Sequence, residues 1–281
     1  MKKKKKKRRK RKATSLAPPP IKSRKIARVV TSKFHEITHE IERLENKNTK
    51  LDHVEKRRME ALKQQLDELG GRQRYQDASK ISTRHNRTVK YVCSILTKLN
   101  LRPKKKEPKL KVLEIGAINT HLLDVAFMDT LAIDLNSCNH RIKQIDFLKL
   151  KPRKEYDVVV SSMVINCVPT KELRLKMLLN IYEHLKINGH LFLILPLLCI
   201  RKSAFQDCKK FVKFLNEIGF KLKHSKTSPK LAFFCCEKNK YNVIDSNNNT
   251  ISDSSSCCSN IVDEKKLLNK WGSSLKFQFA A

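Results

Sequence analysis

The chain alternates short, continuously apolar runs with segments whose apolar residues recur at helical spacing, and this alternation constrains the fold most. The apolar runs that we expect to be strands are residues 110–115, 130–135, 157–160 and 191–195. Helical spacing predicts one helix over 171–185 and another that buries residues between 205 and 215. Gly219 and Phe220 then begin a last pair of strands. Strands that are apolar throughout are typical of a parallel sheet covered on both faces, so this order predicts a doubly wound α/β sheet with right-handed crossovers.

Helical spacing also precedes the sheet. Apolar residues at helical spacing begin near Lys33, are interrupted at Gly70 and Gly71, and continue after them as far as Pro103. The sequence does not decide whether these apolar stripes pack on one another or on the sheet. We divide the chain into a disordered basic tail (1–30), a helical N-terminal region (31–103), an α/β domain (107–240), and a low-complexity insert with a C-terminal segment (241–281).

Positive charge dominates the composition. The chain has 61 Lys and Arg residues against 27 Asp and Glu residues, a net charge of +34. Eleven of the positive charges form an unbroken run over residues 2–12, which leaves +23 on the remainder. Such an excess indicates a polyanionic partner, with nucleic acid as the first candidate. Runs of this kind also serve as nuclear or nucleolar addresses, so we expect a nucleolar protein.

Several classes are excluded. The longest apolar run, residues 191–200, is interrupted by Pro196 and is too short to span a bilayer, and a proline-rich segment follows the basic start where a signal peptide needs an apolar one. The nine cysteines contain no C-x-x-C pair, so we expect reduced intracellular thiols, and the histidines are too dispersed for a metal site. We therefore predict neither a membrane protein nor a metalloprotein.

Candidate site residues follow the strands, because ligands of open α/β sheets bind beyond the carboxyl ends of the strands. Glu114 and Gly116 end the first strand, and we expect Asn119 or Thr120 to cap a helix after it. Asp134 lies at the end of the second strand, twenty residues after Glu114, a spacing typical of an acid that binds ribose hydroxyls. We add two further candidates, Asp146 beside an apolar residue that suits an adenine ring and Asn166 after the third strand.

These segments resemble a known family. Residues 110–236 are similar to class I S-adenosylmethionine-dependent methyltransferases in the segments VLEIGAI (112–118), AIDLN (132–136), QIDF (144–147) and HLKINGHLFLILP (184–196). More narrowly, the chain resembles the fungal 25S ribosomal RNA adenine-N1 methyltransferases, through Lys33-Phe34-His35, the Gly70-Gly71 turn with residues 75–79, and SSMVINCVP (161–169).

The resemblance implies the fold, the cofactor and the substrate. It implies a class I, Rossmann-like sheet that binds S-adenosylmethionine through Gly116 and Asp134, with Asp146 near the adenine moiety and Glu114 holding the loop or reaching the methionine ammonium. It also implies methyl transfer to N1 of an adenine in 25S rRNA within pre-60S particles. Asn166 would bind the exocyclic amino group of the target adenine, as amide side chains do at adenine edges.

Two other interpretations stay open. The first is a non-catalytic S-adenosylmethionine-responsive sensor that acts through protein contacts, as in animal proteins that resemble this family. The second is a ribosome-assembly factor that has lost cofactor binding. The positive charge favours the enzyme over the sensor, because a sensor of protein partners has no need of it.

Overall fold

The computed structural model describes residues 21, 23–45, 47, 52–83, 87–137, 139–239 and 263–277. The chain divides into two compact units between Ser82 and Thr83. The basic run over residues 2–12 lies outside the described residues, and so does the stretch over 247–260, whose Asn-rich and Ser-rich composition predicts disorder.

The described residues of the first unit form three helices, α1 (Arg24–Glu45), α2 (His53–Glu68) and α3 (Gly71–Thr83). Ile37 and Ile41 of α1 pack against Leu62 of α2, which accounts for the apolar stripes of both helices. The predicted boundary of the disordered tail, residue 30, is wrong, because α1 already begins at Arg24. Ala27 and Val30 extend the stripe of α1 in the amino-terminal direction and are buried against Ala78, which favours helix over disorder there.

The next helix, α4 (Arg87–Lys98), belongs to the second unit, although the sequence grouped it with the helical region. Val92, Ile95 and Leu96 of this helix are buried with Val158 and Phe192 of the sheet. This settles the question that the sequence left open. The stripe of α4 packs on the sheet, whereas the stripes of α1 and α2 pack on each other.

The second unit contains a seven-stranded sheet in the order β3-β2-β1-β4-β5-β7-β6. Its strands are β1 (Leu110–Ile115), β2 (Met128–Asp134), β3 (Lys143–Gln144), β4 (Tyr156–Ser162), β5 (Leu185–Pro196), β6 (Phe220–Thr227) and β7 (Leu231–Lys238). The pairs among β1 to β5 are parallel, and β7 is antiparallel to both of its neighbours. The doubly wound α/β sheet is thus confirmed, and β6 runs in the same direction as β5.

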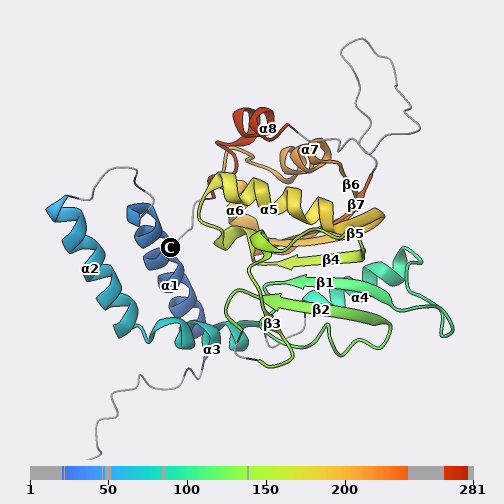
Figure 1. Ribbon diagram of the computed structural model, residues 1–281, viewed down its shortest axis with the longest axis horizontal. Helices are drawn as coiled ribbons and strands as arrows, with labels where there is room; N and C mark the ends of the chain where they lie inside the picture. The colour runs from blue at the N-terminus through green and yellow to red at the C-terminus, as the bar shows by residue number, and fades with distance from the viewer. Residues whose placement is uncertain are drawn as a thin grey trace, which may run out of the picture. The chain divides into compact units, whose positions relative to one another are not determined.

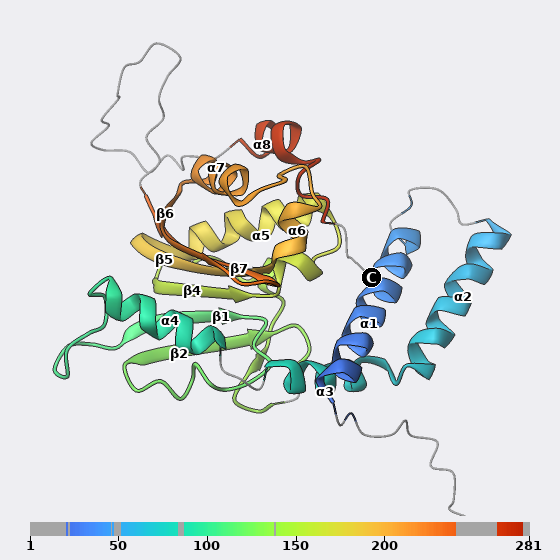
Figure 2. The ribbon, with the colours of Figure 1, turned by 180° about the vertical axis from the view of Figure 1, so that it is seen from behind.

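Helices cover the two faces of the sheet unequally (Figures 1 and 2). One face carries α5 (Lys171–His184), α7 (Cys208–Ile218) and the C-terminal α8 (Glu264–Trp271) in the larger core, and α4 covers the other. The short helix α6 (Leu197–Arg201) directly follows β5, and two single 3-10 turns, η1 (Phe147–Lys149) and η2 (Ile165–Cys167), precede and follow β4.

The helix expected after the first strand is absent, because residues 116–127 form turns. Asn119 caps no helix; its side-chain Oδ1 accepts a hydrogen bond from the His121 backbone N–H at 3.1 Å. Local bonds of this kind compete with helix formation. Leu122 and Val125 join the cluster around α4, so α4 covers the face that a crossover helix would otherwise cover.

The Asn188-Gly189 pair favours a turn between a helix and a strand in the sequence, but the structure differs. They lie within β5, where the register against β4 shifts between Tyr156 and Val158. Asn188 has φ = 64°, and a Cβ on Gly189 would lie 2.9 Å from the Lys186 carbonyl oxygen. The pair therefore forms an irregularity that lets β5 begin earlier than its apolar run.

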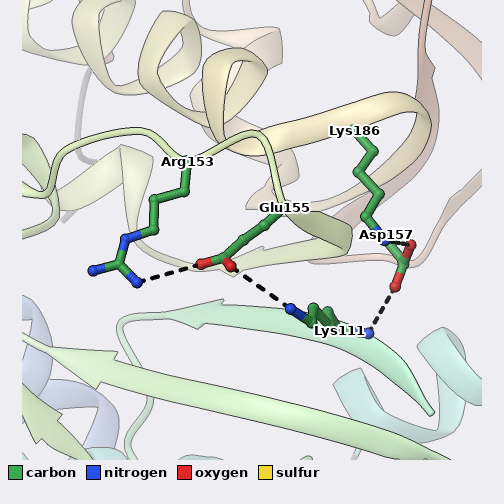
Figure 3. A network of polar contacts seen from close by, with 5 residues as sticks. All are labelled: Lys111, Arg153, Glu155, Asp157 and Lys186. Carbon is green, nitrogen blue, oxygen red and sulfur yellow. Dashed lines mark hydrogen bonds and ion pairs between the residues drawn. The ribbon is translucent and has the colours of Figure 1, made fainter. Parts of the chain in front are cut away.

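Ion pairs join the amino ends of the strands (Figure 3). The Asp157 carboxylate accepts a hydrogen bond from the Lys111 backbone N–H at 2.8 Å and pairs with the Lys186 ammonium at 2.7 Å. Glu155 pairs with Lys111 at 3.7 Å and with Arg153 at 3.9 Å. These contacts connect β1, the start of β4 and β5 at the edge opposite the candidate site.

Candidate active site at the carboxyl ends of the strands

The topology brings the predicted site residues to one edge of the sheet. In the parallel register Ile115 of β1 lies beside Ile133 of β2 and Ser161 of β4, so Gly116, Asp134 and the loop after β4 follow at the same level. The short strand β3, which the sequence did not predict, pairs with the end of β2 and brings Asp146 to this edge as well. Figure 1 shows the arrowheads of β1, β2 and β4 pointing to this edge.

Glu114 is a buried acid with an unsatisfied oxygen. Its neighbours across the strands are Ala132 and Val160, both apolar, and its exposed fraction is 9%. Burial raises the pKa of the Glu114 carboxyl to about 8. Its Oε2 atom is buried and has no hydrogen-bond partner among the described residues. At neutral pH the group is therefore mostly protonated and can donate one hydrogen bond or, after deprotonation, bind a cation.

Gly116 is required by local packing. Its φ of +70° is unfavourable for residues with a side chain, and an added Cβ would collide with the Val164 side chain from the loop after β4. The Ala117 backbone N–H donates to the Ile133 carbonyl at 2.9 Å, which fixes the turn on β2. Gly116 thus brings the loops after β1 and β4 together, in addition to any contact with a ligand.

Asp134 and Asp146 both order the turns that carry them. The Asp134 side chain accepts from the Asn136 backbone N–H at 2.8 Å, and the Asp146 side chain caps η1 by accepting from Leu148 N–H at 3.0 Å. The Ile145 backbone N–H donates to the Asp134 carbonyl at 3.0 Å, which links the two turns. Each of these bonds is accepted by one carboxylate oxygen, and a carboxylate group can accept several hydrogen bonds at once.

Asn166 lies in η2 with an exposed fraction of 4%. Its amide Nδ2 donates to the Cys167 sulfur at 3.3 Å, while its Oδ1 is buried without a partner among the described residues. Orphaned buried acceptors are rare in proteins and are costly unless a ligand satisfies them. Asn166 is therefore positioned, as predicted, in the loop that follows β4 at the site.

Three features of this edge were missed from the sequence. Met163 has φ = 63° and a partly exposed side chain, so the loop after β4 carries backbone strain of the kind that gathers at functional sites. The Ser162 and Thr88 hydroxyls lie 3.0 Å apart and join β4 to α4. The Ser161 hydroxyl is buried without a partner in the described chain. Only Ser161 and Ser162 could have been noticed in the sequence, because they are polar residues at the end of an apolar strand.

No group of three or more His, Cys, Asp or Glu side chains in the described ranges is placed to hold a metal ion. Among the described helices, none has the length and apolar character needed to cross a membrane.

Comparison with known proteins agrees with the geometry. The family model described as 25S rRNA (adenine(2142)-N(1))-methyltransferase, Bmt2, matches residues 60–269. A 25S rRNA adenine-N(1) methyltransferase of Schizosaccharomyces pombe is 34% identical over 137 residues, 46% of this chain and 50% of the relative. The 25S rRNA (adenine(2142)-N(1))-methyltransferase of Saccharomyces cerevisiae is 30% identical over 181 residues, 61% of this chain and 52% of the relative. The chain thus spans about half the length of these curated relatives.

Solved structures align more weakly. The 1,6-didemethyltoxoflavin-N1-methyltransferase of Burkholderia thailandensis, solved with S-adenosylhomocysteine, is 13% identical with a TM-score of 0.43, and the alignment covers 56% of this chain and 80% of that one. The fold assignment rests instead on the strand order and directions of the sheet, which are those of a Rossmann-like, class I methyltransferase domain.

Proposed function

The chain belongs to the family of 25S rRNA (adenine(2142)-N(1))-methyltransferases, and on that premise we propose that it transfers a methyl group from S-adenosylmethionine to N1 of an adenine in large-subunit ribosomal RNA. The observation that carries the proposal is the meeting, at one sheet edge, of Glu114, Gly116, Asp134 and the loop that holds Asn166. The RNA specificity and the whole activity come from the family and are part of the proposal.

The residues at this edge fit the cofactor. S-adenosylmethionine supplies an electrophilic methyl group on a sulfonium centre, together with ribose hydroxyls, an adenine amino group and a methionine ammonium. Asp134 would accept from the ribose hydroxyls and Asp146 would accept from the adenine amino group. The unpartnered oxygen of Glu114 suits the ammonium or a loop donor, and the Gly116 backbone permits close approach.

The chain's remaining task is to position the target base. N1 of neutral adenine carries a free lone pair, so attack on the methyl group needs no general base once the base is unpaired. The N1–methyl bond forms as the sulfur–methyl bond breaks, and the positive charge passes from sulfur to the adenine. Alignment of nucleophile, methyl and sulfur can contribute about 7 to 11 kcal/mol. Extruding the base from its stack costs a few kcal/mol.

Asn166 is the residue that we assign to base recognition. Its buried Oδ1 would accept from the adenine exocyclic amino group, which becomes a stronger donor as the ring gains positive charge. We expect Asn166→Ala to lower methyl transfer at least tenfold while calorimetry shows unchanged S-adenosylmethionine affinity. A reduction smaller than threefold would remove Asn166 from this role.

The central experiment tests cofactor and product together. Purified protein is incubated with S-adenosylmethionine and an unmodified 25S rRNA transcript, and N1-methyladenosine is mapped as a primer-extension stop. We expect Asp134→Asn to abolish the stop and to weaken S-adenosylmethionine binding roughly tenfold or more, since bonds to charged groups contribute about 1.5–3 kcal/mol. This variant keeps an acceptor oxygen for Asn136 N–H.

Asp129→Asn is the matched control, because Asp129 is an exposed acid at the opposite end of β2. It should retain both the stop and the affinity. Cofactor binding without any methylated nucleotide would instead support the sensor, and loss of both in the wild type would leave an assembly factor.

Location and assembly belong to the same proposal. We infer nucleolar localisation and association with pre-60S particles, supported by the basic run over residues 2–12 and by the large-subunit rRNA named in the family description. A fluorescent fusion that stays nucleolar with the run and loses that location without it would support the assignment, and uniform cytoplasmic fluorescence of the full chain would reject it.

A further inference from the structure

The half of the sheet beyond β5 ends at the same edge as the candidate site. Because β7 is antiparallel to both β5 and β6, the end of β6 and the end of β5 lie at this edge. The Leu197 backbone N–H donates to the Lys230 carbonyl at 2.8 Å, which fixes the β6–β7 turn against the start of α6. In Figures 1 and 2, α6 lies at the edge to which the arrowheads of β1 and β4 point.

Exposed cations gather on the segments that meet here. These segments are α6, the β6–β7 turn and the start of α7. Helix α7 ends at the opposite edge, just before β6 begins, so its start lies toward the edge of the candidate site. We name these residues the carboxyl-edge cations: Arg201, Lys202, Lys209, Lys210, Lys226 and Lys230.

The carboxyl-edge cations have almost no acids among them. Residues 197–210 and 226–231 contain one acid, Asp207, and its side chain is engaged in capping α7 through the Lys210 backbone N–H at 2.8 Å. Within the described ranges none of the six forms an ion pair. These segments therefore carry a net positive charge that their own acids do not neutralise.

At the opposite edge some cations are paired with acids, and others, among them Lys109 and Lys221, form no ion pair within the described ranges. There Lys111, Arg153 and Lys186 are paired with acids (Figure 3), and Lys154 lies 3.4 Å from Glu183. Paired and unpaired cations also occur within a single strand: Lys223 of β6 pairs with Glu237 at 2.9 Å, whereas Lys226, three residues nearer the site, has no such partner in the described chain. Positive charge that no acid pairs with therefore lies at the edge that carries the candidate site.

We propose that the carboxyl-edge cations bind the phosphates of the RNA strand that flanks the target adenine and hold it across the ends of β5 and β6 and the start of β7. This inference rests on the proposed function, because it takes RNA as the substrate. Flexible cationic side chains on three separate segments suit a chain of regularly spaced phosphates, which fix position without reading sequence.

The test compares two double variants of the full-length chain. Lys226→Gln with Lys230→Gln removes two carboxyl-edge cations, and Lys151→Gln with Lys221→Gln removes two exposed cations at the amino edge. Binding to an unmodified 25S rRNA transcript is measured over a series of salt concentrations, and thermal unfolding verifies that both variants fold.

We expect the carboxyl-edge pair to make the slope of log affinity against log salt less negative by about 1.4, since each lost phosphate contact on a single strand contributes about 0.7. We also expect roughly fivefold to tenfold weaker binding near physiological salt and a matching rise in KM for the RNA. S-adenosylmethionine affinity should not change. The amino-edge pair should resemble the wild type in all these measurements.

Equal slopes and KM values for the two double variants would overturn the inference. This failure is distinguishable from failure of the proposed function, which would appear in the wild type as absent S-adenosylmethionine binding or absent N1-methyladenosine. If the wild type methylates the transcript and the carboxyl-edge variant behaves like the amino-edge control, only the proposal that the carboxyl-edge cations bind phosphates is rejected.

Discussion

The ionisation of Glu114 is coupled to folding. Burial raises its pKa from 4.5 to about 8, so between these values the folded chain holds a proton that the unfolded chain has released. The contribution of Glu114 to stability is therefore greatest below pH 4.5 and is lost as pH rises to about 8. Ligand binding that needs the ionised carboxylate must work against this preference, whereas a neutral carboxyl donor would not.

We expect Glu114→Gln to remove this pH dependence. The amide resembles the protonated acid, so at pH 5 the variant should match the wild type in free energy of unfolding. At pH 8 it should be more stable by an amount on the order of 2–4 kcal/mol. Urea unfolding at both pH values measures the difference, with Glu264→Gln as an exposed control in α8. Parallel pH profiles for wild type and Glu114→Gln would refute the assignment.

Two separate features require a glycine at position 116: its positive φ and the Val164 side chain that an added Cβ would meet. Gly116→Ala should lower the free energy of unfolding by about 2–4 kcal/mol, of which the left-handed backbone accounts for roughly 1–2. Adding Val164→Ala should restore part of the loss, with a coupling of at least about 0.5 kcal/mol in a double-mutant cycle. Strict additivity would show that Val164 is not the obstacle.

At the scale of elements, the sequence predicted those that bury a continuous apolar run. The first strand is confirmed with its expected ends, Leu110 and Ile115, because both faces of a parallel strand are covered. The strand β3 was not predicted, since its two residues, Lys143 and Gln144, are polar and exposed. The absence of a helix after β1 and the packing of α4 on the sheet could not be predicted, for the same reason. Either segment can cover that face of the sheet, and the spacing of apolar residues within a segment does not show which surface the segment packs against.

The C-terminal segment illustrates long-range packing that a local pattern cannot place. Trp271 of α8 stacks on Phe205 with ring centroids 5.7 Å apart, and its indole N–H donates to Glu217 at 2.7 Å. The buried Arg174 side chain donates to the Leu275 carbonyl and lies 4.8 Å from the Phe277 ring centroid. Residues 263–277 therefore complete the core over α5 and α7, which the sequence left open.

We expect the docking of α8 to contribute measurably to stability. Trp271→Ala should lower the free energy of unfolding by about 2–4 kcal/mol, because it removes the stacked ring and the partner of Glu217. Trp271→Phe keeps the ring contact and should cost about 1 kcal/mol. Chemical denaturation of the two variants provides the comparison, and equal losses would mean that the hydrogen bond rather than the stacking holds the helix.

At the scale of the whole molecule, the candidate site was predictable in place but not in detail. Parallel strands end at one edge, which is why Gly116, Asp134 and Asn166 were identified from positions after apolar runs. The engagement of Asp146 in capping η1 and the strain at Met163 depend on backbone angles that residue types alone do not fix. The distribution of charge shows the same limit, because pairing along the amino edge is visible only once β1, β4 and β5 are adjacent.

The basic run over residues 2–12 contributes a large part of the net charge of +34, and its deletion separates general RNA binding from binding positioned at the candidate site. Deleting residues 2–12 removes eleven positive charges and should reduce affinity for a 25S rRNA transcript and for an unrelated RNA by the same factor, because phosphate contacts carry no base identity. The salt slope should become less negative by several units if most of the run engages phosphates, at about 0.7 for each contact on single strands. Binding isotherms with both RNAs at several salt concentrations measure this. A deletion that weakens only the rRNA complex would show that the run reads structure in its target, and an unchanged slope would show that it does not contact RNA.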